Sequence, residues 1–514
     1  MGILSNLEPA PVFKYFEEIC NIPHGSGNTD AISSFCVNFA IEHGLKYLKD
    51  ENNNVIIWKE GTKGYENSPS VIIQGHLDMV CEKEAGCNIN FEKDGIKLHL
   101  DNGIISAEGT TLGGDDGIAI AYALAILESD NIPHPPIEAV FTVDEEVGMT
   151  GAAALDCSPL KSRIMLNIDS EEEGYLLVSC AGGASVTVHL PVIRKGVSGI
   201  PATIKITGLK GGHSGVEIDK GRANSNMLMG RTLYLLSQKY QFNIFSIYGG
   251  NKDNAIPRET HATVVFKTGT VIEDVQKDIE EIDKIYSNEY YSTDPGIKTN
   301  IEIEEGSNRY AFNNKSTSRI ITALVSFPNG IQHMSHDIEG LVQTSLNLGI
   351  LKITQIDRRY GYKHNSGEWY SQMAKTDQRY AYYHYSTEVS LNYSVRSSIS
   401  TEKEEVINRI KCLAEALKCT ITCQGDYPAW EYKKDSPLCR LMTEVFEEQY
   451  GKKPVVQAIH AGVECGLFAG KLPGLDCVSY GPDIKNIHTP QEFMDVESVR
   501  RTWEYTLEIL KRLK

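Results

Sequence analysis

Two adjacent carboxylates between glycines, directly before an entirely apolar helix, constrain this chain more than any other feature. The run Gly113-Gly114-Asp115-Asp116-Gly117 precedes residues 118–127, which are apolar on every side and predict a helix buried in a core. The start of a helix offers free N–H groups and partial positive charge. The pair therefore predicts either a helix cap or a metal or catalytic site.

Four apolar strands are each followed by a histidine or a carboxylate. The strands are predicted over residues 70–74, 137–143, 163–168 and 475–480, and the side chains that follow are His76, Glu145 with Glu146, Asp169 and His488. Helical segments alternate with the strands, which predicts an α/β sheet with a ligand site beyond the carboxyl ends of its strands. Because so much unpaired negative charge is costly, we expect bound cations: zinc, or manganese or cobalt. The number of side chains favours two ions that share a carboxylate.

The middle of the chain has a different pattern. Alternating apolar and polar strands begin near residue 185, with charged helical segments between them, which predicts an antiparallel sheet with helices on one face. After a turn-rich break near residue 427 the first pattern resumes. We therefore predict a discontinuous α/β catalytic domain, residues 1–184 and 428–514, with an α+β domain of residues 185–427 inserted between its two parts.

Composition excludes several classes of partner. A net charge of −18 argues against a nucleic-acid-binding surface. The chain start lacks a secretory signal and residues 118–127 are too short to cross a bilayer, so we expect no membrane partner and a cytoplasmic location. The 12 cysteines are scattered, without a Cys-x-x-Cys pair, which argues against a thiolate zinc site or a disulfide framework. The run Glu171-Glu172-Glu173 is predicted to be solvated.

As a set, these motifs resemble the di-zinc exopeptidases that include carboxypeptidase G, tripeptidase T and carnosinase. The matching stretches are Gly75-His76-Leu77-Asp78, Gly114-Asp115-Asp116-Gly117, Asp144-Glu145-Glu146-Val147-Gly148, Asn167-Ile168-Asp169 and His488-Thr489-Pro490-Gln491-Glu492. Residues 181–183, 211–217, 221–224 and 460–466 are similar to bacterial aminoacyl-histidine dipeptidases. The resemblance covers nearly the whole chain and implies that the inserted domain is a lid or dimerisation-type domain.

The resemblance also implies roles for individual residues. It implies that two divalent metal ions are held by His76, Asp115, Glu146, Asp169 and His488. Asp115 would bridge the two ions, and its peptide bond to Asp116 would be cis. Glu145 would be the general base for a metal-bridging hydroxide, and Asp78 would orient His76.

Further residues are implied to bind the substrate. His213 would donate to the oxyanion, often across a dimer interface in relatives, and Asn254 and Arg396 would hold the substrate backbone and its carboxylate. Each has a structural alternative: a turn residue for His213 and a paired surface charge for Arg396. His460 either lines the site or is a structural histidine.

The predicted function is metal-dependent hydrolysis of dipeptides, preferentially Xaa-His such as β-alanyl-histidine. The partner is then a dipeptide substrate, and a homodimer is one expected assembly. An N-acyl amino acid amidase or deacylase on the same scaffold is the nearest alternative. A binding protein with a non-catalytic metal site is another, although the presence of every presumed ligand and of the base speaks against it.

Overall fold

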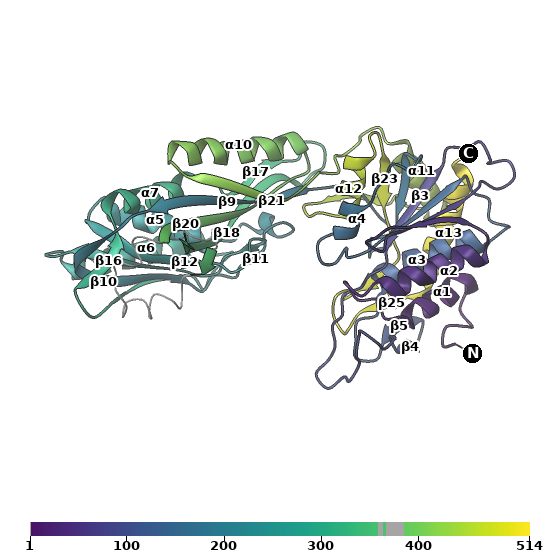
Figure 1. Ribbon diagram of the computed structural model, residues 1–514, viewed down its shortest axis with the longest axis horizontal. Helices are drawn as coiled ribbons and strands as arrows, with labels where there is room; N and C mark the ends of the chain where they lie inside the picture. Colours follow the sequence, from purple (N-terminus) through teal and green to yellow (C-terminus); the bar gives the residue numbers. More distant parts are fainter. Residues whose placement is uncertain (1, 358–362, 366–384) are drawn as a thin grey trace. The chain divides into compact units, whose positions relative to one another are not determined.

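The computed structural model describes residues 2–357, 363–365 and 385–514, which form two compact units. The first unit consists of Met1–Cys180 and Pro428–Lys514, and the second of Ala181–Tyr427 (Figure 1). The first boundary lies a few residues before the expected position, because strand β9 (Gly182–Val192) pairs with β20 (Tyr385–Ser397) from its first residue onward. The chain thus leaves the first unit and returns to it, the order that the change of pattern predicts.

The first unit is built around a mixed sheet. Its strands, in spatial order, are β1 (Lys46–Lys49), β2 (Val55–Lys59), β6 (Ile137–Thr142), β3 (Val71–His76), β7 (Ile164–Asn167), β23 (Asp476–Ser479), β8 (Tyr175–Cys180) and β22 (Val455–Ile459). The neighbours β6, β3, β7 and β23 are parallel to one another, so their carboxyl ends meet at one edge. These are the four strands that the sequence predicts to end in polar residues.

Helices cover both faces of this sheet. They are α1 (Ala10–Cys20), α2 (Asp30–Glu42), α3 (Gly114–Glu128), α4 (Thr150–Ala154), α11 (Pro437–Tyr450), α12 (Glu464–Lys471) and α13 (Val496–Arg512). Ile73, Phe141 and Leu166 of the central strands point into a core shared with α1, α2, α3, α11 and α13. Because side chains alternate along a strand, the residues that follow them point to the opposite face, where α12 packs. Helix α3 is buried along almost its whole length, which confirms the interpretation of its apolar sequence.

A small antiparallel sheet in the same unit carries one of the predicted ligands. It consists of β24 (Ile484–Lys485), β25 (Phe493–Asp495), β5 (Ile104–Ala107) and β4 (Leu98–Asp101). His488 lies in the loop between β24 and β25, and its backbone has φ = 60°. Pairing of β25 with β5 holds this loop to the chain segment that precedes α3.

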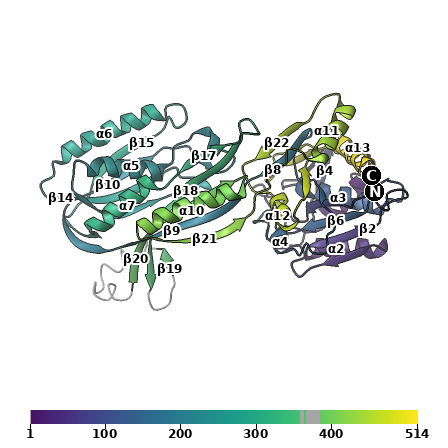
Figure 2. The same cartoon turned by 90° about the horizontal axis from the view of Figure 1, so that it is seen from above.

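The second unit is an antiparallel sheet covered by helices on one face (Figure 2). Its longest path of strands is β15 (Lys298–Ile303), β10 (Arg194–Thr207), β14 (Thr260–Lys267), β12 (Phe242–Gly249), β18 (Val342–Asp357), β20, β9 and β21 (Thr420–Tyr427). Shorter elements are β11 (Gly212–His213), η1 (Ile218–Lys220), β13 (Ala255–Ile256), β16 (Asn308–Phe312), β17 (Gly330–Met334) and β19 (Lys363–Asn365). Alternate residues of β9, such as Val186 and Val188, pack against the helices α5 (Ser225–Ser237), α6 (Ile272–Glu289), α7 (Asn314–Ser326) and α10 (Ser400–Ala416).

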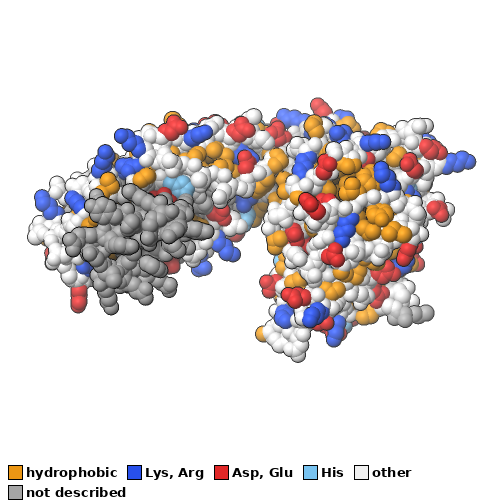
Figure 3. All heavy atoms as spheres, viewed as in Figure 1, with side chains coloured by type: hydrophobic (Ala, Val, Ile, Leu, Met, Phe, Trp, Pro, Cys, Tyr) orange, Lys and Arg blue, Asp and Glu red, His pale blue; other side chains and the backbone are white. Residues whose placement is uncertain are grey.

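Acidic and basic side chains are interspersed on the face drawn in Figure 3. Among the helices of the described residues, none combines the length and the apolar character needed to cross a membrane.

Candidate metal centre

The parallel strands deliver four predicted site residues to one edge of the sheet. His76 is the last residue of β3, Glu145 and Glu146 follow β6, and Asp169 follows β7. Helix α3 begins at the same place, and Asp115 and Asp116 depart from helical φ and ψ, so the regular helix starts after them. The peptide bond between these two aspartates is cis, as the resemblance implies.

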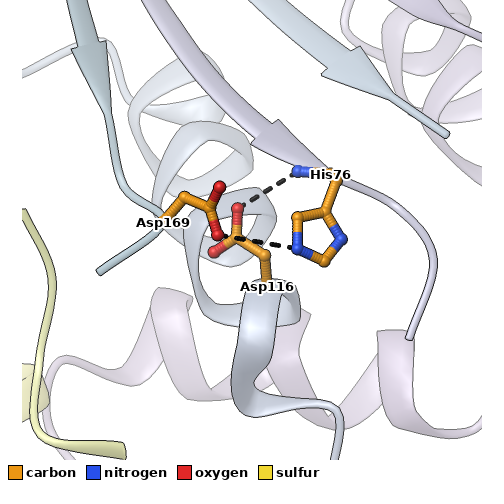
Figure 4. A group of neighbouring side chains, drawn as sticks. All are labelled: His76, Asp116 and Asp169. Atoms are coloured by element: carbon orange, nitrogen blue, oxygen red, sulfur yellow. Dashed lines mark hydrogen bonds and ion pairs between the residues drawn. The ribbon is translucent and has the colours of Figure 1, made fainter. Parts of the chain in front are cut away.

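The His76 ring faces carboxylates with one nitrogen and a carbonyl with the other. Its Nε2 lies 3.1 Å from Asp115 Oδ1 and 3.6 Å from Asp169 Oδ1 (Figure 4 draws the second contact). Its Nδ1 lies 2.9 Å from the Asp78 carbonyl oxygen, which can only accept, so Nδ1 carries the hydrogen. The backbone N–H of His76 donates to Asp116 Oδ2 at 3.1 Å. Nε2 is therefore the nitrogen aimed into the site.

A second histidine completes the other half of the cluster. His488 Nε2 lies 3.0 Å from Glu146 Oε1 and 3.3 Å from Asp115 Oδ2. Hydrogen bonds to Asp115 and Glu146 raise the pKa of His488 to about 10. The two oxygens of Asp115 thus face two different histidines, which is the arrangement that a carboxylate bridging two ions requires.

The donor set fits divalent cations. Three groups bring ligand atoms within 4.8 Å of one another: His76 with Asp116 and Asp169, His76 with Glu145 and Glu146, and Asp115 with Glu146 and His488. Burial, with nearby carboxylates, raises the pKa of Asp116, Glu145 and Asp169, so ionising all of them together is unfavourable without compensating positive charge. Imidazole nitrogens and carboxylate oxygens are ligands of zinc, manganese and cobalt.

Asp78 supports the base more directly than it supports His76. Its Oδ1 accepts from the Glu145 N–H at 3.0 Å, and its Oδ2 accepts from Ser26 Oγ at 2.8 Å and from the Glu146 N–H at 3.4 Å. Its carboxylate is 3.6 Å from His76 Nδ1, farther than its own carbonyl oxygen. Burial raises the pKa of Asp78, but its interaction with His76, together with the bonds from Ser26 and the Glu145 N–H, holds that pKa below its ordinary value. Asp78 therefore fixes the turn that carries Glu145.

His213 lies in the second unit, where its tautomer is fixed. It ends β11, which pairs with β13. The N–H groups of Gly215 and Val216 donate to His213 Nδ1 at 3.1 and 3.2 Å, so Nδ1 is an acceptor and the hydrogen is on Nε2. Burial, with the charge of Arg396, lowers the pKa of His213 and favours the neutral ring. The result is a neutral histidine with its hydrogen on Nε2.

The other predicted binding residues are divided between the units. Arg396, on β20 of the second unit, donates from Nη1 to the Tyr427 hydroxyl at 3.1 Å. Asn254 belongs to the same unit, is exposed, and its carbonyl accepts from the Ser214 N–H at 2.9 Å. His460 directly follows β22 in the first unit and is 5 % exposed.

Comparison with known proteins identifies the family. Residues 72–512 match the peptidase family M20/M25/M40. The chain belongs to this family. It is 34% identical over 516 residues to the cytosol non-specific dipeptidase of Escherichia coli (strain K12), covering 100% of this chain and 99% of that protein. The resemblance found in the sequence motifs and the predicted fold class are thereby confirmed.

Solved structures agree with the family. Aminoacylhistidine dipeptidase from Vibrio alginolyticus has a TM-score of 0.86 and 34% identity, covering 99% of this chain and 98% of that chain. The aminopeptidase PepT from Bacillus cereus ATCC 10987 has a TM-score of 0.53 and 15% identity, covering 99% of each chain, and shows likeness of fold alone.

Sequence reasoning missed two buried carboxylates of this M20 chain. Glu492 accepts from the N–H groups of Leu112, Gly113 and Gly114 at 2.8, 3.3 and 2.9 Å, and so holds the turn before Asp115. Glu492 is the last residue of the motif formed by residues 488–492, and its place in that motif is the one sign of its importance in the sequence. Glu464, the first residue of α12, is 0 % exposed and contacts β3 and β6.

The acidic run after β7 is not a solvated run. Burial, with Asp115 and Asp169 nearby, raises the pKa of Glu171 to about 7. Glu173 pairs with Arg501, with 2.8 Å between Arg501 Nε and Glu173 Oε1. The predicted exposure therefore holds for Glu172 alone, because its two neighbours are partly buried.

Proposed function

We propose that this chain is a metal-dependent dipeptidase that hydrolyses Xaa-His dipeptides such as β-alanyl-histidine. The observation that carries the proposal is the placement of Asp115 between two histidine nitrogens, 3.1 and 3.3 Å away, with Glu145 beside the cluster. Two divalent ions, zinc or else manganese or cobalt, would be held by His76, Asp115, Glu146, Asp169 and His488. The substrate class is supported by two relatives, named a non-specific dipeptidase and an aminoacylhistidine dipeptidase.

Glu145 and Asp78 have different roles in the proposed hydrolysis. When bound, the two ions would supply an activated water and polarise the scissile carbonyl. Glu145 takes the proton from the attacking water and delivers it to the leaving amine nitrogen. Burial raises the pKa of Glu145, and the positive charge of bound cations would oppose that rise, so that the carboxylate could accept the proton. Asp78 keeps the base in place through its bond to the Glu145 N–H.

Residues of the second unit are assigned to the substrate itself. His213 is the proposed donor to the oxyanion, supported by its neutral ring and its available Nε2–H. Arg396 is the proposed partner of the C-terminal carboxylate, because a guanidinium binds a carboxylate with two parallel hydrogen bonds. Asn254 is proposed to hold the substrate backbone. His460, which belongs to the first unit, is proposed to line the site.

A dipeptide panel tests the function. Hydrolysis is measured for β-alanyl-histidine, glycyl-histidine, histidyl-glycine, glycyl-leucine and N-acetyl-histidine, after chelation and after return of zinc, manganese or cobalt. Glycyl-histidine and histidyl-glycine have the same composition, so the ratio of their rates isolates the position of histidine. Glycyl-histidine and N-acetyl-histidine release the same residue and differ only by the amino group, so the ratio of their rates isolates the requirement for that group.

Each outcome of the panel decides one part of the proposal. Cleavage of Xaa-His peptides that is lost on chelation and returns with metal supports it. Equal rates on glycyl-leucine and glycyl-histidine overturn the histidine preference and leave a non-specific dipeptidase. Cleavage of N-acetyl-histidine without cleavage of any dipeptide supports the amidase alternative. Full metal content with no hydrolysis supports the non-catalytic alternative.

The assembly and the location of the chain are two further proposals. We propose a homodimer, as the resemblance implies, and sedimentation of the full-length chain measures the mass directly. We propose a cytoplasmic location because the Escherichia coli relative is named a cytosol protein. Fractionation of the native cells checks this location.

A further inference from the structure

A buried carboxylate with no role in the proposed reaction stands behind the metal centre. Glu464 is 0 % exposed, and its Oε2 accepts two hydrogen bonds of 2.6 Å, from Gln74 Nε2 and from Thr142 Oγ1. Its Oε1 has no hydrogen-bond partner within the described part of the chain. Burying a carboxylate is costly, so its presence here calls for a reason beyond the filling of space.

The contacts of Glu464 join three strands. Gln74 lies on β3, Thr142 on β6, and Asn167 on β7. Asn167 Nδ2 donates to Gln74 Oε1 at 2.5 Å, and all three side chains are at most 1 % exposed. Glu464 on α12 therefore holds Gln74 of β3 and Thr142 of β6 directly. It holds Asn167 of β7 indirectly, because Asn167 bonds to Gln74.

These polar residues lie immediately behind the proposed ligands. Gln74 and His76 are two residues apart on β3, so they project from the same face of that strand. Asn167 is the last residue of β7, and Asp169 follows it by two residues. Thr142 is the last residue of β6, directly before the turn with Glu145. Any shift of one strand along its neighbour would break this network and change the spacing of the ligands.

We propose that Glu464 is a positioning residue for the metal centre, acting as the shared acceptor that fixes Gln74, Thr142 and Asn167. This inference rests on the proposed metal-binding function. The role belongs to the acceptor oxygen. With an apolar side chain, the Gln74 NH2 group would keep only its 3.2 Å hydrogen bond to Thr142 Oγ1, and the Thr142 hydroxyl only its 3.4 Å bond to the Gly75 carbonyl. A glutamine at this position keeps one acceptor oxygen, whereas a methionine keeps none.

Zinc affinity tests the proposal without any peptide substrate. The full-length chain is compared with Glu464→Gln, Glu464→Met and a control, Glu138→Met, by competition with a chromophoric chelator. Glu138 is also a buried carboxylate on β6, 3 % exposed, and it accepts from the backbone N–H groups of Lys161 and Ser162 at 2.9 and 3.1 Å. It lies at the opposite end of that strand, so its loss affects stability but not the ligands.

The expected pattern separates positioning from general stability. Glu464→Met is expected to weaken zinc binding about 10–100-fold, the usual cost of losing a residue that supports metal ligands. Glu464→Gln is expected to bind zinc close to wild type, and Glu138→Met to melt at a lower temperature with zinc affinity unchanged. Wild-type affinity in Glu464→Met, or an equal loss in Glu138→Met, overturns the proposal. Wild-type protein that binds no divalent ion overturns the proposed function together with this inference.

An exchange of the two side chains keeps the test decisive if Glu464→Met does not fold. Gln74→Glu alone brings two carboxylates into contact and is expected to weaken zinc binding. The double variant Gln74→Glu/Glu464→Gln restores one donor and one acceptor in exchanged places, and its zinc affinity is expected to recover toward wild type. Losses that simply add in the double variant contradict a direct coupling of the two residues.

Discussion

Replacing Glu145 by Gln and, separately, Glu146 by Gln separates the two roles that these adjacent carboxylates are given. Each change exchanges one oxygen for an NH2 group of nearly the same size. The backbone N–H groups of both residues bond to Asp78, at 3.0 and 3.4 Å, so the turn is held in both variants. The two variants are therefore matched controls for each other.

The magnitude follows from the contacts of each side chain. Glu145 is assigned proton transfer, which contributes about 10²–10⁴ in rate, or about 2.7–5.4 kcal/mol at 1.36 kcal/mol per tenfold. Glu146 Oε1 lies 3.0 Å from His488 Nε2. Glu146 and Asp115 are the two carboxylates of the candidate metal-binding group that includes His488. Removing its charge is expected to release the ion of that group while His76 and Asp169 keep the other.

Metal content and turnover are measured on the same samples. After gel filtration in zinc-containing buffer, Glu145→Gln is expected to keep two zinc ions per chain and to lose about 10²–10⁴ in kcat on β-alanyl-histidine. Glu146→Gln is expected to keep one. A Glu145→Gln protein that loses an ion, together with a Glu146→Gln protein that keeps both, refutes the assignment of base and ligand.

Three further predictions concern stability and turnover. Burial raises the pKa of Glu464 from 4.5 to about 7, so its ionisation opposes folding: the cost is absent below pH 4.5 and complete above pH 7, about 3 kcal/mol. Urea melts of metal-free protein measure the free energy of unfolding of Glu464→Gln minus that of the wild type. This difference is expected to rise by about 3 kcal/mol between pH 4.5 and pH 7, and a difference that does not change with pH contradicts the prediction. Gly75→Ala would place a Cβ 2.5 Å from Asp116 Oδ2 and is expected to lower the free energy of unfolding by about 1–3 kcal/mol. The control Gly196→Ala, whose Cβ would have nothing within 4 Å, is expected to change it by no more than about 0.5 kcal/mol. Equal effects of the two variants refute the close approach at Gly75. His213→Ala is expected to lower kcat about 10²–10³-fold with zinc content unchanged, and an unaltered kcat removes His213 from the reaction.

The sequence alone determined the edge of the sheet at which the site forms. Period-two alternation and short apolar runs predict strands. Polar residues stand at or just beyond the ends of β3, β6 and β7, and they include His76, the Glu145–Glu146 pair and Asp169. Parallel strands then bring these ends together without further information. The change to alternating half-polar strands likewise predicted the inserted unit, because strand patterning depends on local burial alone.

Only the tertiary structure decided which buried carboxylate meets which donor. Glu464 and Gln74 are 390 residues apart in the chain, and Glu492 reaches the turn before Asp115 from a distance of 378–380 residues. The Asp78 carboxylate bonds to backbone N–H groups rather than closely to the His76 ring, which residue types and spacing do not reveal. Periodicity reports which face of an element is buried, whereas these bonds depend on how distant elements pack against each other.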